Sequence, residues 1–137
     1  MLAARDLRSW LSAWLQGVVP EGVAVFPAMA RDGFASLPAV GLGALEVPEF
    51  GVTACLDSYT LPVVVAWPRP GISEEDEQAG HETLWLGVLG ALQDLQAEED
   101  TLGGHVAEWH LGSAEYGTLE VRGAAYPAYV ITCQLTA

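Results

Sequence analysis

The chain has 137 residues, 51% of them hydrophobic, with 18 acidic residues against five arginines and no lysine. Its net charge of −13 argues against direct binding of nucleic acid, because contacts with phosphates need lysine and arginine. The length and the apolar content predict one folded domain, residues 1–137, with a hydrophobic core of its own.

The two cysteines, Cys55 and Cys133, are too few and too far apart for a disulfide framework or a CxxC site. We therefore expect two reduced thiols in a cytosolic protein. No uncharged run approaches the ~18 apolar residues that a membrane-spanning helix requires. No membrane partner is expected.

Residues 3–16 predict an amphipathic helix, which Gly17 and Pro20 end. Its apolar residues follow helical spacing along one stripe: Leu7, Trp10, Leu11, Trp14, Leu15 and Val18. Trp10 and Trp14 on this stripe are interpreted either as core residues or as anchors on a partner surface.

Between residues 22 and 67 the hydrophobic period changes to two, which is typical of strands. Four strand-like runs follow one another: "GVAVFPAMA", "LPAVGLGAL", "GVTACL" and "LPVVVAW". The last is apolar throughout and suits a buried strand. Pro27 and Pro38, inside or beside the first two runs, predict sheet edges or bulges there.

The stretch 71–95 predicts a long helix that begins after Ser73 and continues to about Gln96. Four acidic residues at 74–77 suit its first turn, where the helix dipole favours negative charge. After Gly103-Gly104 come three strand-like runs, "HVAEWHL", "GTLEVRG" and "PAYVITCQLT". The order of elements predicts an α+β domain, in which a mainly antiparallel sheet packs with an N-terminal helix and one long central helix.

The histidines do not form a metal site. A zincin helix needs a second histidine four residues after the first, and the residue four after His81 is Trp85. His105 and His110 share one strand-like run at an odd spacing, which places them on opposite faces. Glu108 shares a face with His110, but such a pair alone holds no metal.

Nucleophile and cofactor motifs are also missing from the sequence. No serine lies in G-x-S-x-G, and no P-loop or G-x-G-x-x-G motif is present. A paired-carboxylate site has no specific signal among 18 acidic residues. We therefore expect no cofactor, no metal and no enzymatic activity.

Acidic residues gather at the end of the long helix, where the helix dipole disfavours negative charge. They are Asp94, Glu98, Glu99 and Asp100. Two interpretations stay open: a solvated loop, or an acidic face that meets a basic partner or repels DNA in a lumen.

The order of elements resembles the tail terminator (tail completion) proteins of long-tailed bacteriophages and the related neck proteins. The pattern comprises the short N-terminal helix, the strand "SYTLPVVVAWPRP", the acidic helix with a hydrophobic second half, and the closing strand "AYPAYVITCQLTA". The resemblance implies a virion protein of the tail or neck, made in the host cytoplasm, that forms a ring of commonly six subunits. Such a ring sits on the tail tube protein, stops tube polymerisation and offers a docking surface to the head–tail connector or stopper protein. DNA would pass through its lumen without specific binding.

On this reading, eight apolar residues are candidates for the interface with other subunits or partners: Trp10, Trp14, Phe34, Leu37, Val40, Leu42, Trp67 and Trp109. The segment 33–51 is a candidate arm that packs on another subunit. Alternative functions are another assembly component (a head–tail stopper, a tail tube subunit, or a cap of a contractile tail or injection system) and a small-molecule-binding protein or enzyme.

Overall fold

The computed structural model describes residues 2–28, 37–53, 56–67, 74–121 and 123–137. Helices and strands follow one another as α1 (Ala4–Val18), β1 (Ala24–Phe26), β2 (Ala39–Leu42), β3 (Glu46–Thr53), β4 (Leu56–Ala66), α2 (Glu74–Glu98), β5 (Glu108–Val121) and β6 (Ala124–Thr136). The predicted α+β class and both predicted helices are confirmed.

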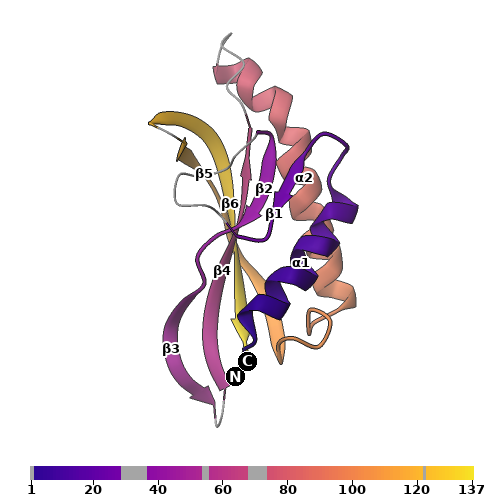
Figure 1. The fold of residues 1–137 in the computed structure, drawn as a ribbon, viewed down its shortest axis with the longest axis vertical. Helices are drawn as coiled ribbons and strands as arrows, with labels where there is room; N and C mark the ends of the chain where they lie inside the picture. The colour runs from indigo at the N-terminus through magenta and orange to yellow at the C-terminus, as the bar shows by residue number, and fades with distance from the viewer. Residues whose placement is uncertain (1, 29–36, 54–55, 68–73, 122) are drawn as a thin grey trace.

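All six strands belong to one sheet, in the order β1-β2-β4-β6-β5. β3 also pairs with β4, so β2 and β3 follow one another along the same edge of that strand. Every pairing is antiparallel except that of β1 with β2. Both helices lie on one face of the sheet, so its other face has no helix over it within the described chain (Figure 1).

β5 corrects the prediction of three strands after Gly103-Gly104. The runs "HVAEWHL" and "GTLEVRG" contribute to one strand of 14 residues, with an irregularity between Leu111 and Ser113. Gly112 occupies this bulge, and a Cβ atom there would lie 2.9 Å from Nε2 of Gln134. The break that the sequence predicts between these two runs is therefore a bulge within one continuous strand.

The two prolines near the first strands lie just outside them. Pro27 follows β1, which forms one edge of the sheet as predicted. Pro38 precedes β2, which lies inside the sheet between β1 and β4. The prediction of a sheet edge is therefore confirmed for the first strand and wrong for the second.

β4 is buried on both faces along its second half. Leu61, Val63 and Val65 point to the helices and join the main hydrophobic cluster. Val64 and Ala66 alternate with them, point to the opposite face, and join a second cluster with Ala39 and Ala128. This double burial explains the uninterrupted apolar run that predicted a buried strand.

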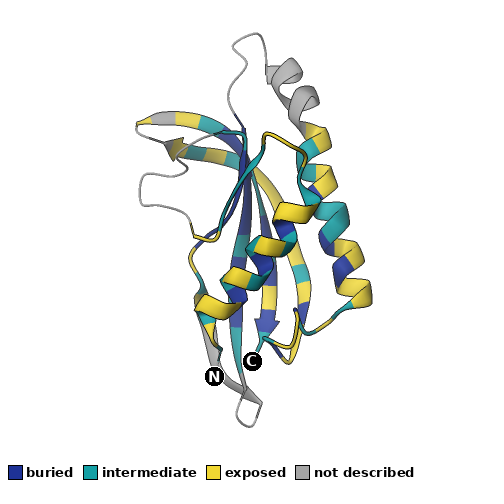
Figure 2. Ribbon diagram, turned by 45° about the vertical axis from the view of Figure 1, so that its right-hand side comes forward, coloured by how far each residue is buried: buried dark blue, intermediate teal, exposed yellow. Residues whose placement is uncertain are grey.

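The helices cover the first of these faces with leucines. Leu7, Leu11 and Leu15 of α1 recur every four residues and are at most 1% exposed. Val88, Leu92 and Leu95 of α2 are buried in the same cluster. Figure 2 shows the buried side of each helix toward the sheet and the exposed side away from it.

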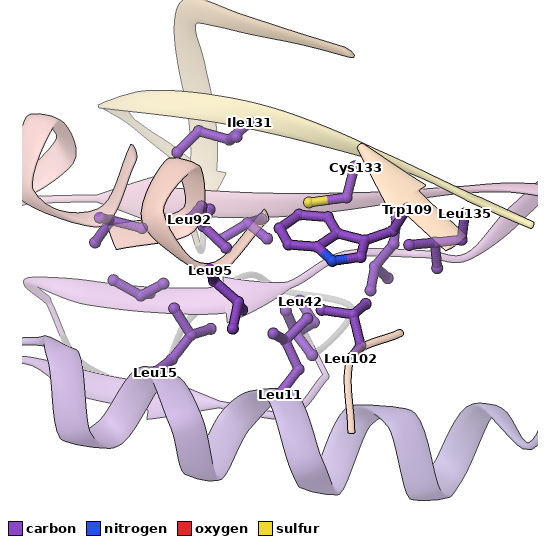
Figure 3. Packing of buried hydrophobic residues seen from close by; sticks show 14 of the residues in the cluster. Leu11, Leu15, Leu42, Leu92, Leu95, Leu102, Trp109, Ile131, Cys133 and Leu135 are labelled. Atoms are coloured by element: carbon purple, nitrogen blue, oxygen red, sulfur yellow. The ribbon is translucent and has the colours of Figure 1, made fainter. Parts of the chain in front are cut away.

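Trp109 joins the end of α2 to the sheet. Its ring lies near Cys133, Leu95 and Leu102 in the core (Figure 3). Its Nε1 donates a hydrogen bond to the carbonyl oxygen of Glu99 at 2.8 Å. The indole is thus packed on its apolar surface and satisfied at its one polar atom.

Arg8 ties α1 to one edge of the sheet. Its guanidinium donates hydrogen bonds to the carbonyl oxygens of Pro27 (3.0 Å), Leu42 (3.4 Å) and Gly43 (2.8 Å). These carbonyls lie just after β1, at the end of β2 and just beyond it. The single cation therefore satisfies three acceptors where two strands end.

Leu92→Ala is expected to lower the free energy of unfolding by about 2–5 kcal/mol, because it leaves a cavity where the side chain is 0% exposed. Gln93→Ala on the same helix is the control, since that side chain is exposed and its loss costs at most about 0.5 kcal/mol. Urea denaturation followed by circular dichroism measures both. Equal losses in the two variants would contradict the position of α2 on the sheet.

Candidate interaction surfaces

Four of the eight predicted interface residues belong to the core. Val40, Leu42, Trp67 and Trp109 are 0–4% exposed and pack within their own chain. A side chain enclosed in this way cannot contact a partner in this fold, so their assignment is corrected from interface to core. The predicted arm is corrected in the same way for Ala39–Leu42, which forms β2 of the chain's own sheet.

The other predicted interface residues are half-buried or lie outside the described residues. Trp10, Trp14 and Leu37 are half-buried. Trp10 covers the loop after α2, where a Cβ atom on Gly103 would collide with the indole Nε1. Phe34 is among the residues that the structure does not describe.

His105 lies in the loop before β5 rather than in the strand. Its ring centroid is 6.4 Å from that of Trp10. The prediction that His105 and His110 occupy opposite faces of one strand is therefore wrong. Glu108 and His110 do share one face, the one opposite the helices, since they are two residues apart in β5.

Glu99 has a structural role that its acidic neighbours lack. Its Oε1 accepts hydrogen bonds from the hydroxyl and from the backbone N–H of Thr101, the latter at 2.9 Å. The hydroxyl bond first, and the backbone bond second, hold the pKa of Glu99 below its ordinary value of 4.5. Thr101 Oγ1 in turn accepts a hydrogen bond from Gly104 N at 3.1 Å, so Glu99 organises the loop to β5.

The other three members of the predicted acidic face, Asp94, Glu98 and Asp100, are exposed. No basic residue lies in the last turn of α2. These three remain available to a partner, whereas Glu99 is held within its own chain.

Aromatic rings gather around Tyr129 on β6, where α2 packs on the sheet. Trp85 of α2 stacks on Tyr129 with ring centroids 3.9 Å apart and an interplanar angle of 17°. Trp67 also stacks on Tyr129, with ring centroids 5.8 Å apart, and Tyr116 of β5 approaches Tyr129 edge-on with centroids 5.3 Å apart. The cluster runs from the buried Trp67 to Tyr116, which is 45% exposed.

The exposed end of this cluster lies beside an apolar stretch of α2. Glu82, Trp85, Leu86 and Leu89 follow helical spacing along one side of the helix. The same side continues to Gln96, whose Oε1 accepts a hydrogen bond from the backbone N–H of Leu111 in β5 at 3.0 Å. This side of α2 therefore faces the β5 edge of the sheet. Leu86 and Tyr116 are the exposed large hydrophobic residues of the described chain.

The two ends of the sheet differ in charge. We call the edge strand β5 with the adjacent side of α2 the β5 flank; it carries the exposed carboxylates of Glu82, Glu108, Glu115 and Glu120. We call β1 with the adjacent side of α1 the β1 flank. Arg8 lies on it, and Arg5, three residues earlier, is on the same side of α1 and exposed. These two are the arginines that the structure describes.

The β5 flank was missed in the sequence because its strand was divided in two. The spacing Glu82-Trp85-Leu86-Leu89 was available as a signal, but only the contacts with β5 show which edge of the sheet it faces. Glu108 and Glu120 lie in two runs that the sequence predicts as separate strands, and Glu115 lies between those runs. Their position on one sheet edge follows from the pairing of β5 with β6.

Within the described residues, no group of three or more histidine, cysteine or acidic side chains could hold a metal ion. The side chain of His81 is not among them. Neither helix, over its described residues, is long and apolar enough to cross a bilayer.

No protein-family model matches the chain, and no curated protein matches its sequence.

Thr101→Ala is expected to raise the pKa of Glu99 toward 4.5, because the hydroxyl bond is the larger cause of its lowering. A depressed carboxyl pKa stabilises the folded state above the unfolded value, and this contribution is lost as the pH falls through the folded pKa. NMR titration of the Glu99 carboxyl carbon measures the change. Thr118→Ala, an exposed threonine on β5, is the control and should leave the titration unchanged.

Cys133 is expected to be unreactive in the folded protein. Burial raises the pKa of its thiol from 9.0 to about 12, so the nucleophilic thiolate is scarce at pH 8. In a Cys55→Ser background, a disulfide reagent should label Cys133 at least ~100-fold more slowly than in urea. Because the pKa is raised, the corresponding stability is present below about pH 9 and is lost as the pH rises toward 12. Equal labelling rates in the folded and unfolded protein would contradict the burial.

Proposed function

We propose that the chain is a non-enzymatic structural protein of a phage virion, a tail terminator. Its copies form a closed ring on the last ring of the tail tube, stop tube polymerisation and present a docking surface to the head–tail connector. The order of elements supports this proposal, since the helix, strands, helix and strands of the predicted pattern occur in the fold.

The observation that carries the proposal is the difference between the two ends of the sheet. The β1 flank presents Arg5 and Arg8, whereas the β5 flank presents carboxylates and two exposed hydrophobic residues. A subunit with two unlike, complementary ends associates head to tail, and such contacts close into a ring when the rotation between subunits closes. A surface that pairs with itself would give a two-fold dimer instead.

The uncovered face of the sheet suits the passage of DNA. It carries the carboxylates of Glu108 and Glu115, and no cation lies on it within the described residues. Phosphates bind lysine and arginine, so a lumen lined by such a face would let DNA slide without being held. Asp94, Glu98 and Asp100 lie at the end of α2, on the helix side of the sheet, and stay available to a basic partner protein.

The mass of the native protein, measured by light scattering over a range of concentrations, tests the proposal. A single closed oligomer of about six subunits is expected, and high salt should shift it toward monomers because unlike charges lie at the two flanks. Open-ended growth would identify a tail tube subunit instead.

If the protein is monomeric at every concentration, purified tail tubes should be added. The proposal then expects rings at the tube ends in electron micrographs and no further growth of the tubes when free tube protein is supplied. A monomer that leaves tube growth unchanged would contradict the terminator function. Bovine serum albumin at the same concentration controls for non-specific blocking of the ends.

A further inference from the structure

β5 presents a long open edge at the end of the sheet. It has 14 residues and pairs on one side with β6, while no other strand of the described chain pairs with its outer side. Near the start of β5, Gln96 covers this edge by accepting the hydrogen bond from Leu111 N. The part beyond Gly112 contains the exposed Tyr116, whose ring contacts Tyr129 beside Trp85 of α2, so a strand added there would also meet apolar side chains.

We infer that β5 of one copy pairs with β1 of the next copy, so that the sheets of neighbouring subunits join. This inference rests on the proposed ring and names the contact that builds it. The partner is a second copy of this chain, because the β1 flank offers arginines and an uncharged edge strand to the acidic β5 flank.

Charge selects β1 among the three edge strands. β3 contains Glu46 and Glu49, and β5 itself contains Glu108, Glu115 and Glu120. Like charges on facing strands are destabilising, which disfavours pairing of β5 with either of them. β1 has the sequence Ala-Val-Phe and no charge; its flank adds Arg5 and Arg8, and the exposed Glu21 lies in the turn before it.

Strand direction agrees with this choice. β1 is parallel to β2, and three antiparallel pairings then lead from β2 through β4 and β6 to β5. β5 therefore runs opposite to β1. In a ring whose axis follows the strands, all copies point the same way, so β5 and the neighbouring β1 meet as an antiparallel pair, the more stable arrangement.

The register of the sheet places apolar side chains at the junction. One row of paired residues crosses the whole sheet: Val25, Val40, Val65, Tyr129 and Tyr116. Its two end members, Val25 and Tyr116, therefore lie at the same height. Both are on the helix face, where Val25 packs against the main cluster and Tyr116 contacts Tyr129. In a ring, Val25 of one copy comes beside Tyr116 of the next.

Disulfide trapping tests the contact. In a Cys55→Ser background, Val25→Cys with Tyr116→Cys is expected to give, on mild oxidation, a ladder of covalent multimers that ends at the closed ring. The matched control is Val25→Cys with Glu120→Cys, which keeps the strand and face but moves the second thiol by about 13 Å. It should cross-link at least ~10-fold more slowly, because a disulfide needs Cα atoms within about 7 Å.

A second pair keeps the test independent of Tyr116. Ala24 and Gly117 are the end members of the next row, on the face without helices, and a Cβ atom at Gly117 meets nothing within 4 Å. Ala24→Cys with Gly117→Cys should give the same ladder.

Light scattering of the reduced proteins separates the two proposals. Rings that cross-link through both matched pairs and not through the control support the inference. Rings that cross-link through neither pair, or equally through the control, overturn the β5–β1 contact and leave the ring proposal standing. Monomers that do not cross-link, even on added tail tubes, overturn both.

Discussion

The fold depends on β4, a strand that has to be buried on both of its faces. Its alternating residues supply the main core on one side, through Leu61, Val63 and Val65, and a second cluster on the other, through Val64 and Ala66. It pairs with β2 and β3 along one edge and with β6 along the other. Apolar burial at both faces and hydrogen bonding at both edges make the middle of a sheet the stable place for this segment.

Once β4 is central, the two ends of the sheet are left to different elements. α1 covers the side of β1 and β2 and brings Arg8 to three carbonyl oxygens there. α2 covers the side of β5, where Trp85 stacks on Tyr129 and Gln96 accepts a bond from Leu111. The arginines at one end belong to α1, whereas three of the four carboxylates at the other end belong to β5 itself. They link the fold to the proposed ring.

The acidic character of the chain serves more than one purpose. Glu99 is used inside the molecule, where it accepts hydrogen bonds from Thr101 and offers its carbonyl oxygen to Trp109. The glutamates of β5 lie on an open strand edge, where like charges disfavour pairing of that strand with another copy of itself. In the proposed ring, the same charges favour the one edge that carries arginines. The net charge of the chain alone does not distinguish a carboxylate that is bonded within the chain from one that faces a partner.

Local pattern was enough to predict the class of the fold. The four-residue recurrence of Leu7, Leu11 and Leu15 identifies a helix, and the apolar run that contains Val63–Val65 identifies a buried strand. Each of these patterns is complete within a short stretch of sequence. The roles of Trp67 and Trp109 could not be predicted, since a tryptophan suits a core and an interface equally well. Only the packing of distant segments around them decides that they are enclosed. That β5 is one strand, and that its flank differs from that of β1, likewise depend on pairings between distant residues.

The sequence by itself therefore determined the elements and their apolar sides, through short-range periodicity. Tertiary structure decided which side chains face a partner, because that depends on which segments far apart in the chain meet.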